Sequence, residues 1–424
     1  MKRTLIRDLK PGKTVTVAGF VDKIRDQKSI QFIVLRDRTG RVQVTVFKPD
    51  LPEIAKVFEG MTHDTVVSIT GKVVAAPQVK LGGIELVPAS VNILSPAKLS
   101  PIDEKTGPDL AMDYRWIDLR DDKKTQYFKV MTLGEQAIRD WFVKNEFIEI
   151  HTPKITAFSS EGGSEVFEVK YYDKKAYLTQ SPQLFKQMAM AAGFERVFEI
   201  GPQYRAEKSY TNRHASESFA LDLEISYINS HHDVMDLEEK MLKDVMTVLH
   251  KKCGTALPPA GRFPRITLEQ SYELLKKERN YIVPRASKGD LDPEGERLLC
   301  EISREKWNSD FIFVTDYPAA VRAFYSMKHE DNPMLTKSFD LLYKGQELNS
   351  GAMREHSPEK LRQNMRDKGI NPADMEFYVQ FFEYGCPPHG GIGFGLGRFF
   401  ARLLDLPALR DVTFLFRGPD RLQP

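Results

Sequence analysis

The sequence has few cysteines and no long apolar run, and both absences narrow the class of protein. Its 424 residues include 3 cysteines, Cys253, Cys300 and Cys386, which lie far apart and form no CxxC pair. This spacing argues against a structural zinc site and fits a reducing compartment. No segment approaches the length that spans a membrane, and the first residues contain no apolar signal core. We therefore expect a soluble, cytoplasmic protein with no membrane partner.

Two common nucleotide-binding signatures and a strong net charge are also absent. The chain contains neither a Walker loop nor a Rossmann glycine fingerprint, which excludes the folds that carry them. Its formal net charge is +2, so any nucleic-acid surface must come from local clustering of basic residues. What is present is an ordinary globular composition, 41% hydrophobic, on a chain whose length suits about two or three domains.

Short β-rich segments dominate residues 1–98. They lie at 14–21, 30–35, 41–47, 66–69, 72–74 and 84–87, with a hairpin signal at 36–40. About five short strands in this length fit an OB-fold, a common single-strand binder, while an SH3-like barrel fits the pattern nearly as well. Residues 99–125 are polar and proline-bearing, which is typical of a linker.

Residues 126–424 mix helices with strand pairs, so we expect an α+β protein. Residues 236–250 place their apolar side chains on one helical stripe. Ser357 and Pro358 predict the start of another helix, and Gly369 predicts its end. Strand pairs are expected near 196–228 and 339–349. In the second strand of the first pair, Asp222 and Glu224 fall on the face opposite the leucines.

Two segments of this region contain the residues of an anion site. Arg205 ends a strand, Glu207 falls on the same face, and the loop that follows contains Arg213 and His214. Far along the chain, residues 391–398 alternate glycine with other residues and end in Arg398. Glycines let the backbone approach a bulky anion, and arginine binds phosphate oxygens through a fixed fork of donors. Together the segments predict a two-point grip on a polyphosphate.

The other candidates are individually weak, and each has an ordinary structural alternative. Glu161 lies in a glycine-rich turn, and Gln183 and Lys186 share one helical face. Glu347 could ligate Mg²⁺ together with substrate phosphates, and Arg354 could bind a carboxylate bidentately. Taken alone, a plain turn, a solvated lysine or an ion pair at a strand end explains each of them as well.

Taken together, these segments resemble the class II aminoacyl-tRNA synthetases. Residues 147–153 look like the family's motif 1, which ends in proline and forms the dimer interface, residues 197–224 look like motif 2, and residues 391–398 look like motif 3. The order of the motifs and the N-terminal barrel point to the aspartyl, asparaginyl and lysyl subgroup. Segments 180–186, 204–207, 211–214 and 387–391 look like aspartyl-tRNA synthetase. Residues 225–390 leave no room for the inserted domain of the bacterial type, so the resemblance is to the archaeal/eukaryotic type.

The resemblance implies a fold, an activity and partners. The fold is an OB-fold anticodon-binding domain at 1–98, a hinge at 99–125 and an antiparallel-sheet catalytic domain, flanked by helices, at 126–424. The activity is that of a homodimeric aspartate–tRNA ligase, which activates L-aspartate with ATP and transfers it to tRNA(Asp). Three alternatives stay open: charging of tRNA(Asn) as well, an asparagine–tRNA ligase, and a paralogue that charges no tRNA.

The resemblance also implies a role for each candidate residue. Arg205 would hold the α-phosphate of ATP, Glu207 would bind the adenine amino group, and Arg398 would hold the γ-phosphate with Arg213 and His214. Asparagine would leave the cations around the substrate side chain unpaired, which favours aspartate as the substrate. The remaining ligands divide into Mg²⁺ ligands, Glu347 and Ser350; ligands of the aspartate ammonium, Glu161, Gln183 and Asp222; and ligands of its side-chain carboxylate, Lys186 and Arg354.

On the barrel, the resemblance implies that Phe32 stacks on an anticodon base, a contact worth about 1–3 kcal/mol. Arg25 and Gln43 would contact the anticodon by hydrogen bonding, and Lys80 occupies a position where tRNA(Asp)-restricted relatives carry lysine. The alternative for Phe32 is a place in the barrel core.

The sequence departs from the family pattern at several positions. Gly397 stands where motif 3 usually has glutamate, and Ala352 and Met353 replace the usual Gly-Gln before the substrate arginine. Gly418 lies in a C-terminal segment where relatives usually have Pro-Arg-Asp. Asp22 occupies a barrel position where relatives tend to carry tryptophan or histidine and where the first anticodon base is judged. These departures leave catalytic efficiency and the choice of tRNA open.

Overall fold

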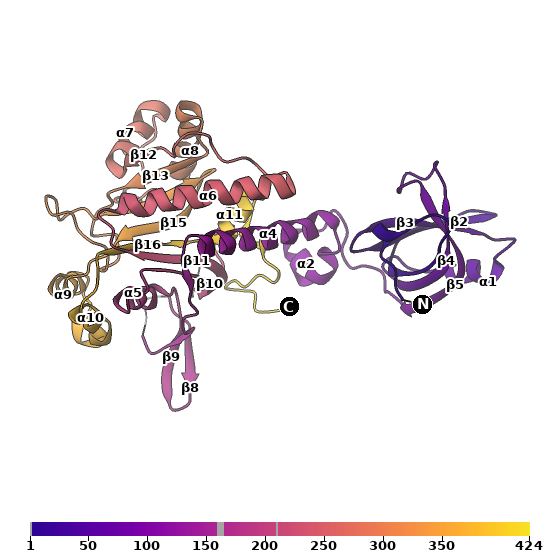
Figure 1. Ribbon diagram of the computed structural model, residues 1–424, viewed down its shortest axis with the longest axis horizontal. Coiled ribbons are helices and arrows are strands. Elements are labelled where there is room, and N and C mark those ends of the chain that lie inside the picture. Colours follow the sequence, from indigo (N-terminus) through magenta and orange to yellow (C-terminus); the bar gives the residue numbers. More distant parts are fainter. Residues whose placement is uncertain (1, 159–164, 209–210) are drawn as a thin grey trace. The chain divides into compact units, whose positions relative to one another are not determined.

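The computed structural model describes residues 2–158, 165–208 and 211–424 (Figure 1). Contacts divide the chain into two compact units, residues 1–110 and 111–424. The division falls inside segment 99–125, which the sequence pattern sets apart as a linker. This segment contains helices α2 (Pro108–Asp113) and α3 (Arg115–Asp118). Each unit has a hydrophobic core of its own.

The N-terminal unit is a closed barrel with the strand order β1-β2-β3-β5-β4. Neighbouring strands are antiparallel except β3 and β5, which close the barrel in parallel, and helix α1 (Pro52–Phe58) lies between β3 and β4 in sequence. This order and this helix are those of an OB-fold and not of an SH3-like barrel. The strands are β1 (Thr14–Asp26), β2 (Ile30–Asp37), β3 (Gly40–Phe47), β4 (Val66–Ala75) and β5 (Ile84–Ser95), and the 3-10 turn η1 (Ile6–Asp8) precedes them.

One barrel strand is longer than the sequence predicts. The pattern separates residues 66–69 from 72–74 at Gly71, whereas both segments belong to β4. A Cβ at Gly71 would lie 2.3 Å from the Val87 carbonyl oxygen on β5. The glycine is therefore needed for the close approach of two strands and not for a turn.

The second unit is built on a sheet with the order β12-β13-β14-β15-β16-β11-β10-β6. Pairing is antiparallel except at the two edges, where β12 joins β13 and β6 joins β10 in parallel. The predicted strand pairs are confirmed as the hairpins β10–β11 and β14–β15. The strands of this sheet are β6 (Ile148–Glu149), β10 (Arg196–Tyr204), β11 (Glu217–Ser226), β12 (Arg265–Thr267), β13 (Phe311–Thr315), β14 (Ser338–Tyr343), β15 (Gln346–Met353) and β16 (His389–Phe394). A smaller sheet, β7-β9-β8, contains β7 (Ile155–Thr156), β8 (Glu168–Tyr171) and β9 (Lys174–Leu178).

Local sequence signals set the ends of helices α6 (His231–Cys253) and α9 (Pro358–Asp367). Ser230 caps α6 with its side chain, and Gly254, at a φ of 70°, ends it. Ser357 caps α9 in the same way, which confirms the predicted helix start. The other helices are α4 (Asp122–Lys144), α5 (Gln183–Ala191), α7 (Leu268–Arg279), α8 (Pro293–Trp307), α10 (Glu376–Glu383) and α11 (Leu396–Leu403), with 3-10 turns η2 (Arg285–Ser287), η3 (Pro372–Met375) and η4 (Leu409–Val412).

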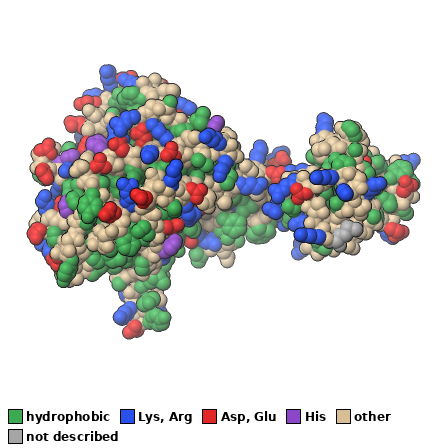
Figure 2. All heavy atoms as spheres, in the orientation of Figure 1, with side chains coloured by type: hydrophobic (Ala, Val, Ile, Leu, Met, Phe, Trp, Pro, Cys, Tyr) green, Lys and Arg blue, Asp and Glu red, His purple; other side chains and the backbone are tan. Residues whose placement is uncertain are grey.

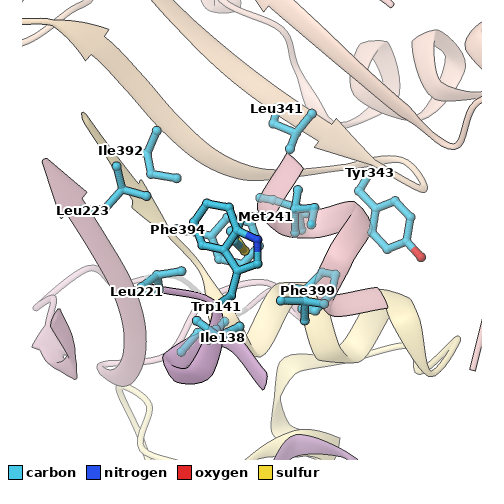
Figure 3. Packing of buried hydrophobic residues seen from close by; sticks show 14 of the residues in the cluster. Ile138, Trp141, Leu221, Leu223, Met241, Leu341, Tyr343, Ile392, Phe394 and Phe399 are labelled. Carbon is cyan, nitrogen blue, oxygen red and sulfur yellow. The ribbon is translucent and has the colours of Figure 1, made fainter. Parts of the chain in front are cut away.

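Helices α4, α6 and α11 contribute to one core against the large sheet (Figure 1). Figure 3 shows Trp141 of α4 and Met241 of α6 close to the side chains of β11 and β16. On β11, Leu223 belongs to this core, so the flanking Asp222 and Glu224 point to the opposite face of the sheet. The predicted alternation is confirmed, and it directs two carboxylates away from the apolar core.

Two global properties of the chain bear on its partners. Among the residues that the structure describes, no helix combines the length and apolarity needed to cross a bilayer. On the face drawn in Figure 2, lysine and arginine side chains are interspersed with aspartate and glutamate. A net charge of +2 predicts this mixture.

Candidate active site

A cleft lies on the sheet face opposite the helical core. Its cavity of about 270 Å³ is bounded by side chains of β11 and β15, by the end of β16 and the start of α11, and by the loop between β10 and β11. Lys186 lies behind the wall of the cavity, and Glu161 lies outside the described residues. The cavity brings together most of the residues predicted from the sequence, namely Gln183, Arg205, Glu207, Arg213, His214, Asp222, Glu347, Ser350, Arg354 and Arg398.

A network of buried charges forms one end of the cleft. Lys186 Nζ lies 2.8 Å from Asp222 Oδ1 and also donates to the Ile392 carbonyl oxygen at 2.8 Å. Arg354 binds Glu224 through two nitrogens, at 2.9 and 3.3 Å. Burial alone would raise the pKa of Glu224, but the charges of Arg354 and Lys186 hold that pKa below its ordinary value. Each of these buried cations is therefore matched by a carboxylate.

Glu224 is a site residue to which the sequence analysis assigned no role. It is fully buried, and its carboxylate lies 3.5 Å from Lys186 as well as against Arg354. The available signal was its position on the same strand face as Asp222. One nitrogen of Arg354 makes no hydrogen bond, because within the described part of the chain its Nη1 has no acceptor. Arg354 lines the cavity, so a carboxylate bound there would meet its guanidinium.

A hydrogen-bond relay orients Gln183 beside this network. Gln187 Oε1 accepts from Tyr378 at 3.0 Å and from Gln183 Nε2 at 2.8 Å, and Gln187 Nε2 lies 2.9 Å from His389 Nε2. His389 Nδ1 contacts the Pro387 carbonyl oxygen at 2.9 Å, which assigns the proton to Nδ1. Burial lowers the pKa of His389 to about 4, so the ring is neutral. The relay uses the amide nitrogen of Gln183, which leaves its oxygen to accept from a ligand ammonium.

The opposite end of the cleft contains the arginines of the predicted phosphate grip. Arg205 Nη1 lies 3.4 Å from Glu207, and its side chain is nearly half exposed. Arg398 Nη1 donates to the Glu347 carbonyl oxygen at 3.2 Å. Burial and the nearby positive charge of Arg398 lower the pKa of His214. Both arginines therefore border the cavity, as predicted.

Arg213 differs from its predicted role in one respect. It lines the cavity, but its guanidinium is held at 2.7 Å by Glu296 of α8 and at 3.2 Å by the Gly345 carbonyl oxygen. Glu296 also accepts from the backbone N–H of Glu347. Sequence spacing gave no signal for Glu296, because α8 reaches this place only through the packing of the sheet.

A β-bulge aims the predicted metal ligands into the cleft. Leu342 pairs with Glu347 and Leu341 pairs with Asn349, so Leu348 is an extra residue in β15. In a regular strand, residues three apart point to opposite faces, whereas the bulge lets Glu347 and Ser350 both line the cavity. Burial and the charge of the neighbouring Asp340 raise the pKa of Glu347 to about 7.

These residues fit Mg²⁺ as one component of a site. Asp340 Oδ1 is buried and has no hydrogen-bond partner among the described residues. The described ranges contain no cluster of three or more His, Cys, Asp or Glu side chains that would hold a metal without other ligands. Mg²⁺ commonly binds one or two carboxylates and completes its shell with water and substrate phosphates. Glu347 and the Ser350 hydroxyl line the cavity and are suited to that arrangement, whereas Asp340 is ion-paired with Arg322 at 2.6 Å, and Arg322 also donates to Ser350 Oγ at 3.2 Å.

Replacing Gly391 with alanine should lower the free energy of unfolding by about 1–3 kcal/mol, because overpacking a filled site forces the backbone to shift. Its Cβ would lie 2.1 Å from the Leu223 carbonyl oxygen and 2.3 Å from Glu224 Oε2. Urea denaturation measures the change. The matched control is alanine at Gly393 on the same strand, whose Cβ would meet only Asp222 Oδ1 at 3.4 Å. Equal midpoints for the two variants would contradict the packing argument.

The residues predicted to contact an anticodon lie on the barrel. Phe32 is half-buried on β2 between the fully buried Gln31 and Ile33, so it points out of the barrel core. Arg25 is its cross-strand partner on β1. The other predicted residues are Gln43 on β3, which contacts Glu85 at 3.2 Å, and the exposed Lys80 between β4 and β5.

Comparison with protein families matches both units. Residues 107–417 match the family described as tRNA synthetases class II (D, K and N), and residues 15–94 match the OB-fold nucleic acid binding domain. The chain belongs to the class II tRNA synthetases. It is therefore an aminoacyl-tRNA ligase, and the enzymes of this class depend on ATP.

Relatives resemble this synthetase along its whole length. It is 40% identical to the aspartate–tRNA(Asp) ligase of Pyrococcus abyssi, over 97% of each chain. It is 39% identical to the aspartate–tRNA(Asp/Asn) ligase of Aeropyrum pernix, over 97% of this chain and 96% of the relative. Among solved structures, the asparaginyl-tRNA synthetase of Pyrococcus horikoshii with asparaginyl-adenylate superposes with a TM-score of 0.90 at 30% identity, covering 100% of both chains.

The local packing of the synthetase explains one of its departures from the family pattern. A Cβ at Gly397 would lie 2.4 Å from Leu409 Cδ1, because η4 packs closely against α11 at this position. A glutamate here would require Leu409 to move. For Gly418 and for Ala352 and Met353, the structure offers no comparable explanation of why the usual residues are absent.

Proposed function

We propose that the synthetase is an aspartate–tRNA ligase that joins L-aspartate to tRNA(Asp) at the expense of ATP. The observation that carries the proposal is the buried Arg354, which lines the cavity and is held by Glu224, while its Nη1 makes no hydrogen bond among the described residues. An aspartate side chain gives this nitrogen a charge-assisted hydrogen bond, whereas the asparagine amide oxygen gives only a neutral one. The names of the relatives from Pyrococcus abyssi and Aeropyrum pernix support the same substrate.

The first step joins aspartate to the α-phosphate of ATP. The aspartate α-carboxylate attacks the α-phosphorus, the bond to the β-phosphate oxygen breaks, and pyrophosphate leaves with the electron pair. The nucleophile is already an anion, so no general base is needed. Catalysis then consists of positioning and charge stabilisation. In this proposal Arg205 binds the α-phosphate, Arg398 and His214 bind the γ-phosphate, and Glu207 binds the adenine amino group.

The amino-acid end of the cleft holds the other substrate. Gln183 presents an amide oxygen to the ammonium, with Asp222 beside it, and we assign Glu161 to the same ammonium. Arg354 faces the side-chain carboxylate, and Lys186, behind the wall of the cavity, holds Asp222 and Glu224 in place. When bound, Mg²⁺ would neutralise phosphate charge, and Glu347 and Ser350 would hold it.

In the second step, a hydroxyl of the terminal ribose of tRNA attacks the aspartyl carbonyl carbon, and AMP leaves. We assign residues 1–98 to anticodon binding, with Phe32 stacked on a base and with Arg25, Gln43 and Lys80 around it. Because Phe32 points away from the barrel core, it is available for stacking.

Charging of tRNA(Asn) is a second candidate activity. Relatives from Aeropyrum pernix and Methanopyrus kandleri carry the name aspartate–tRNA(Asp/Asn) ligase, at 39% and 40% identity. On this barrel, Asp22 lies 2.7 Å from Arg41 and 3.2 Å from Arg36. A carboxylate held by two arginines replaces the tryptophan or histidine expected at this position, so base discrimination here must work differently.

We also propose a homodimer in the cytoplasm. The expected interface motif contains β6, where Ile148 is 47% exposed, and the end of α4 leaves Val143 66% exposed. Apolar side chains that a monomer leaves in water favour association. Sedimentation of the purified protein at micromolar concentration tests this assembly.

The function predicts aspartate-dependent exchange of label between pyrophosphate and ATP, and attachment of labelled aspartate to tRNA(Asp). Exchange tests the first step without tRNA, and charging tests both. Purified tRNA(Asn) in a parallel reaction separates a strict enzyme from a dual one.

Each result of these assays has a distinct meaning. Exchange with asparagine but not with aspartate would overturn the assignment of the substrate. Exchange with aspartate and no charging of either tRNA would restrict the protein to amino-acid activation.

A further inference from the structure

The bulge that aims the metal ligands rests on a buried polar contact. Asn349 follows the extra residue of β15, and its side chain points away from the cleft to α6. There its Nδ2 donates to Glu238 Oε2 at 3.3 Å. Both side chains are buried, with Glu238 at 0% and Asn349 at 1% exposure. The contact therefore ties the bulge to the helix beneath it.

Two oxygens of this pair lack a donor. Among the described residues, neither Glu238 Oε1 nor Asn349 Oδ1 has a hydrogen-bond partner. Both are acceptors when the glutamate is ionised, so they cannot satisfy each other. A single proton on the Glu238 carboxyl removes the difficulty, because a protonated acid offers one donor and keeps an acceptor.

We propose that Glu238 is a protonated acid that exchanges two hydrogen bonds with Asn349, and that this pair fixes the bulge that aims Glu347 and Ser350 into the cleft. The acid O–H donates to Asn349 Oδ1, and Asn349 Nδ2 donates to the acid carbonyl oxygen. Glu238 touches no substrate, so it is a positioning residue. Its influence on metal binding rests on the proposed function, whereas its proton does not.

Burial supports the neutral form. A fully buried carboxylate with one long hydrogen bond is strongly disfavoured, and a group in that position keeps its proton instead. Burial raises the pKa of Glu238 well above its ordinary value, and the hydrogen bond from Asn349 opposes this only in part. The neighbouring Glu239 shows the contrast, because it is ion-paired with Lys243 at 2.7 Å.

Infrared difference spectroscopy of the intact protein at pH 8 tests the proton directly. Subtracting the spectrum of E238Q from that of the wild type should leave the carbonyl band of a protonated carboxylic acid. E239Q is the matched control on the same helix, and its difference spectrum should contain carboxylate bands and no carbonyl band of a protonated acid. Carboxylate bands in the E238Q difference would overturn the proposal.

Swapping the acid and the amide between positions 238 and 349 tests the positioning role. The quantity measured is the Mg²⁺ concentration that half-saturates pyrophosphate exchange. E238Q keeps one donor and one acceptor toward Asn349, so its requirement should match the wild type. N349D faces two acids and should raise the requirement by about 10- to 100-fold, the usual effect of losing an outer contact of a metal site. The double variant E238Q/N349D restores one acid and one amide and should return the requirement to the wild-type value.

An unchanged requirement in N349D, or a double variant no better than N349D, would overturn the positioning role. If N349D does not fold, recovery of folding and of the Mg²⁺ requirement in the double variant still supports the reciprocal pair, and failure to recover opposes it. Absence of exchange in the wild type would instead refute the proposed function and leave the infrared result standing.

Discussion

Replacing Arg354 with leucine should lower kcat/KM for aspartate by about 10²- to 10³-fold, because losing one partner of a buried, hydrogen-bonded charge pair with a ligand costs about 2–5 kcal/mol of binding. The variant loses the donor that faces the cavity, and it leaves Glu224 with Lys186 at 3.5 Å as the cation still facing it. ATP binding should change little, since Arg354 lies at the amino-acid end of the cleft. Pyrophosphate exchange, with each substrate varied in turn, measures both effects.

A loss of folding could imitate a loss of binding in this variant. Removing the Arg354 charge leaves the buried Glu224 carboxylate without its bidentate partner, which destabilises the fold. The double variant R354L/E224Q removes both charges, so it should recover thermal stability while its use of aspartate stays poor. Recovery of both properties together would show that Arg354 supports the fold and does not bind the substrate.

Replacing Arg398 with leucine should affect ATP use and spare aspartate use, the opposite of the Arg354 variant. Arg398 contacts the carbonyl oxygen of Glu347 at the phosphate end of the cleft. Its loss should raise KM for ATP and leave KM for aspartate nearly unchanged. If both variants lower the use of ATP and aspartate by equal factors, the division of the cleft into two ends is wrong.

Much of this site could be predicted because side chains along a β-strand alternate strictly between its two faces. The alternation around Leu223 was enough to direct Asp222 and Glu224 to one face, and the structure places that face in the cleft. The same regularity explains why Phe32 was separable from the barrel core once its strand was known. Local capping signals served equally well at α9, where Ser357 acts as predicted.

The rest depended on contacts between distant segments. The Arg354–Glu224 pair joins residues 130 positions apart, and no local pattern indicates which of several carboxylates an arginine will meet. The bulge in β15 breaks the period of two on which the prediction depends, so Glu347 and Ser350 were placed together by resemblance and not by spacing. The break predicted at Gly71 was wrong for a related reason. The close approach of another strand, and not the conformation of Gly71 itself, requires glycine there.

Replacing Arg205 with glutamine should lower kcat for pyrophosphate exchange by about 10²- to 10³-fold, the usual effect of removing one group that stabilises developing charge. The nucleophile and the leaving group are both anionic, so negative charge concentrates around the α-phosphorus as the bonds change. KM for aspartate should stay close to the wild-type value, because the amino acid binds at the other end of the cleft. Rapid-quench measurement of adenylate formation isolates this step from product release.

Stability is the control for this variant. The Arg205 side chain is 45% exposed, so the substitution should leave the melting temperature nearly unchanged. Glu207→Gln is the matched neighbour, because it weakens the expected adenine contact and should raise KM for ATP with a smaller loss in kcat. If Arg205→Gln instead raised KM for ATP and left kcat intact, Arg205 would serve ground-state binding, and stabilisation of the transition state would have to come from another cation of the cleft.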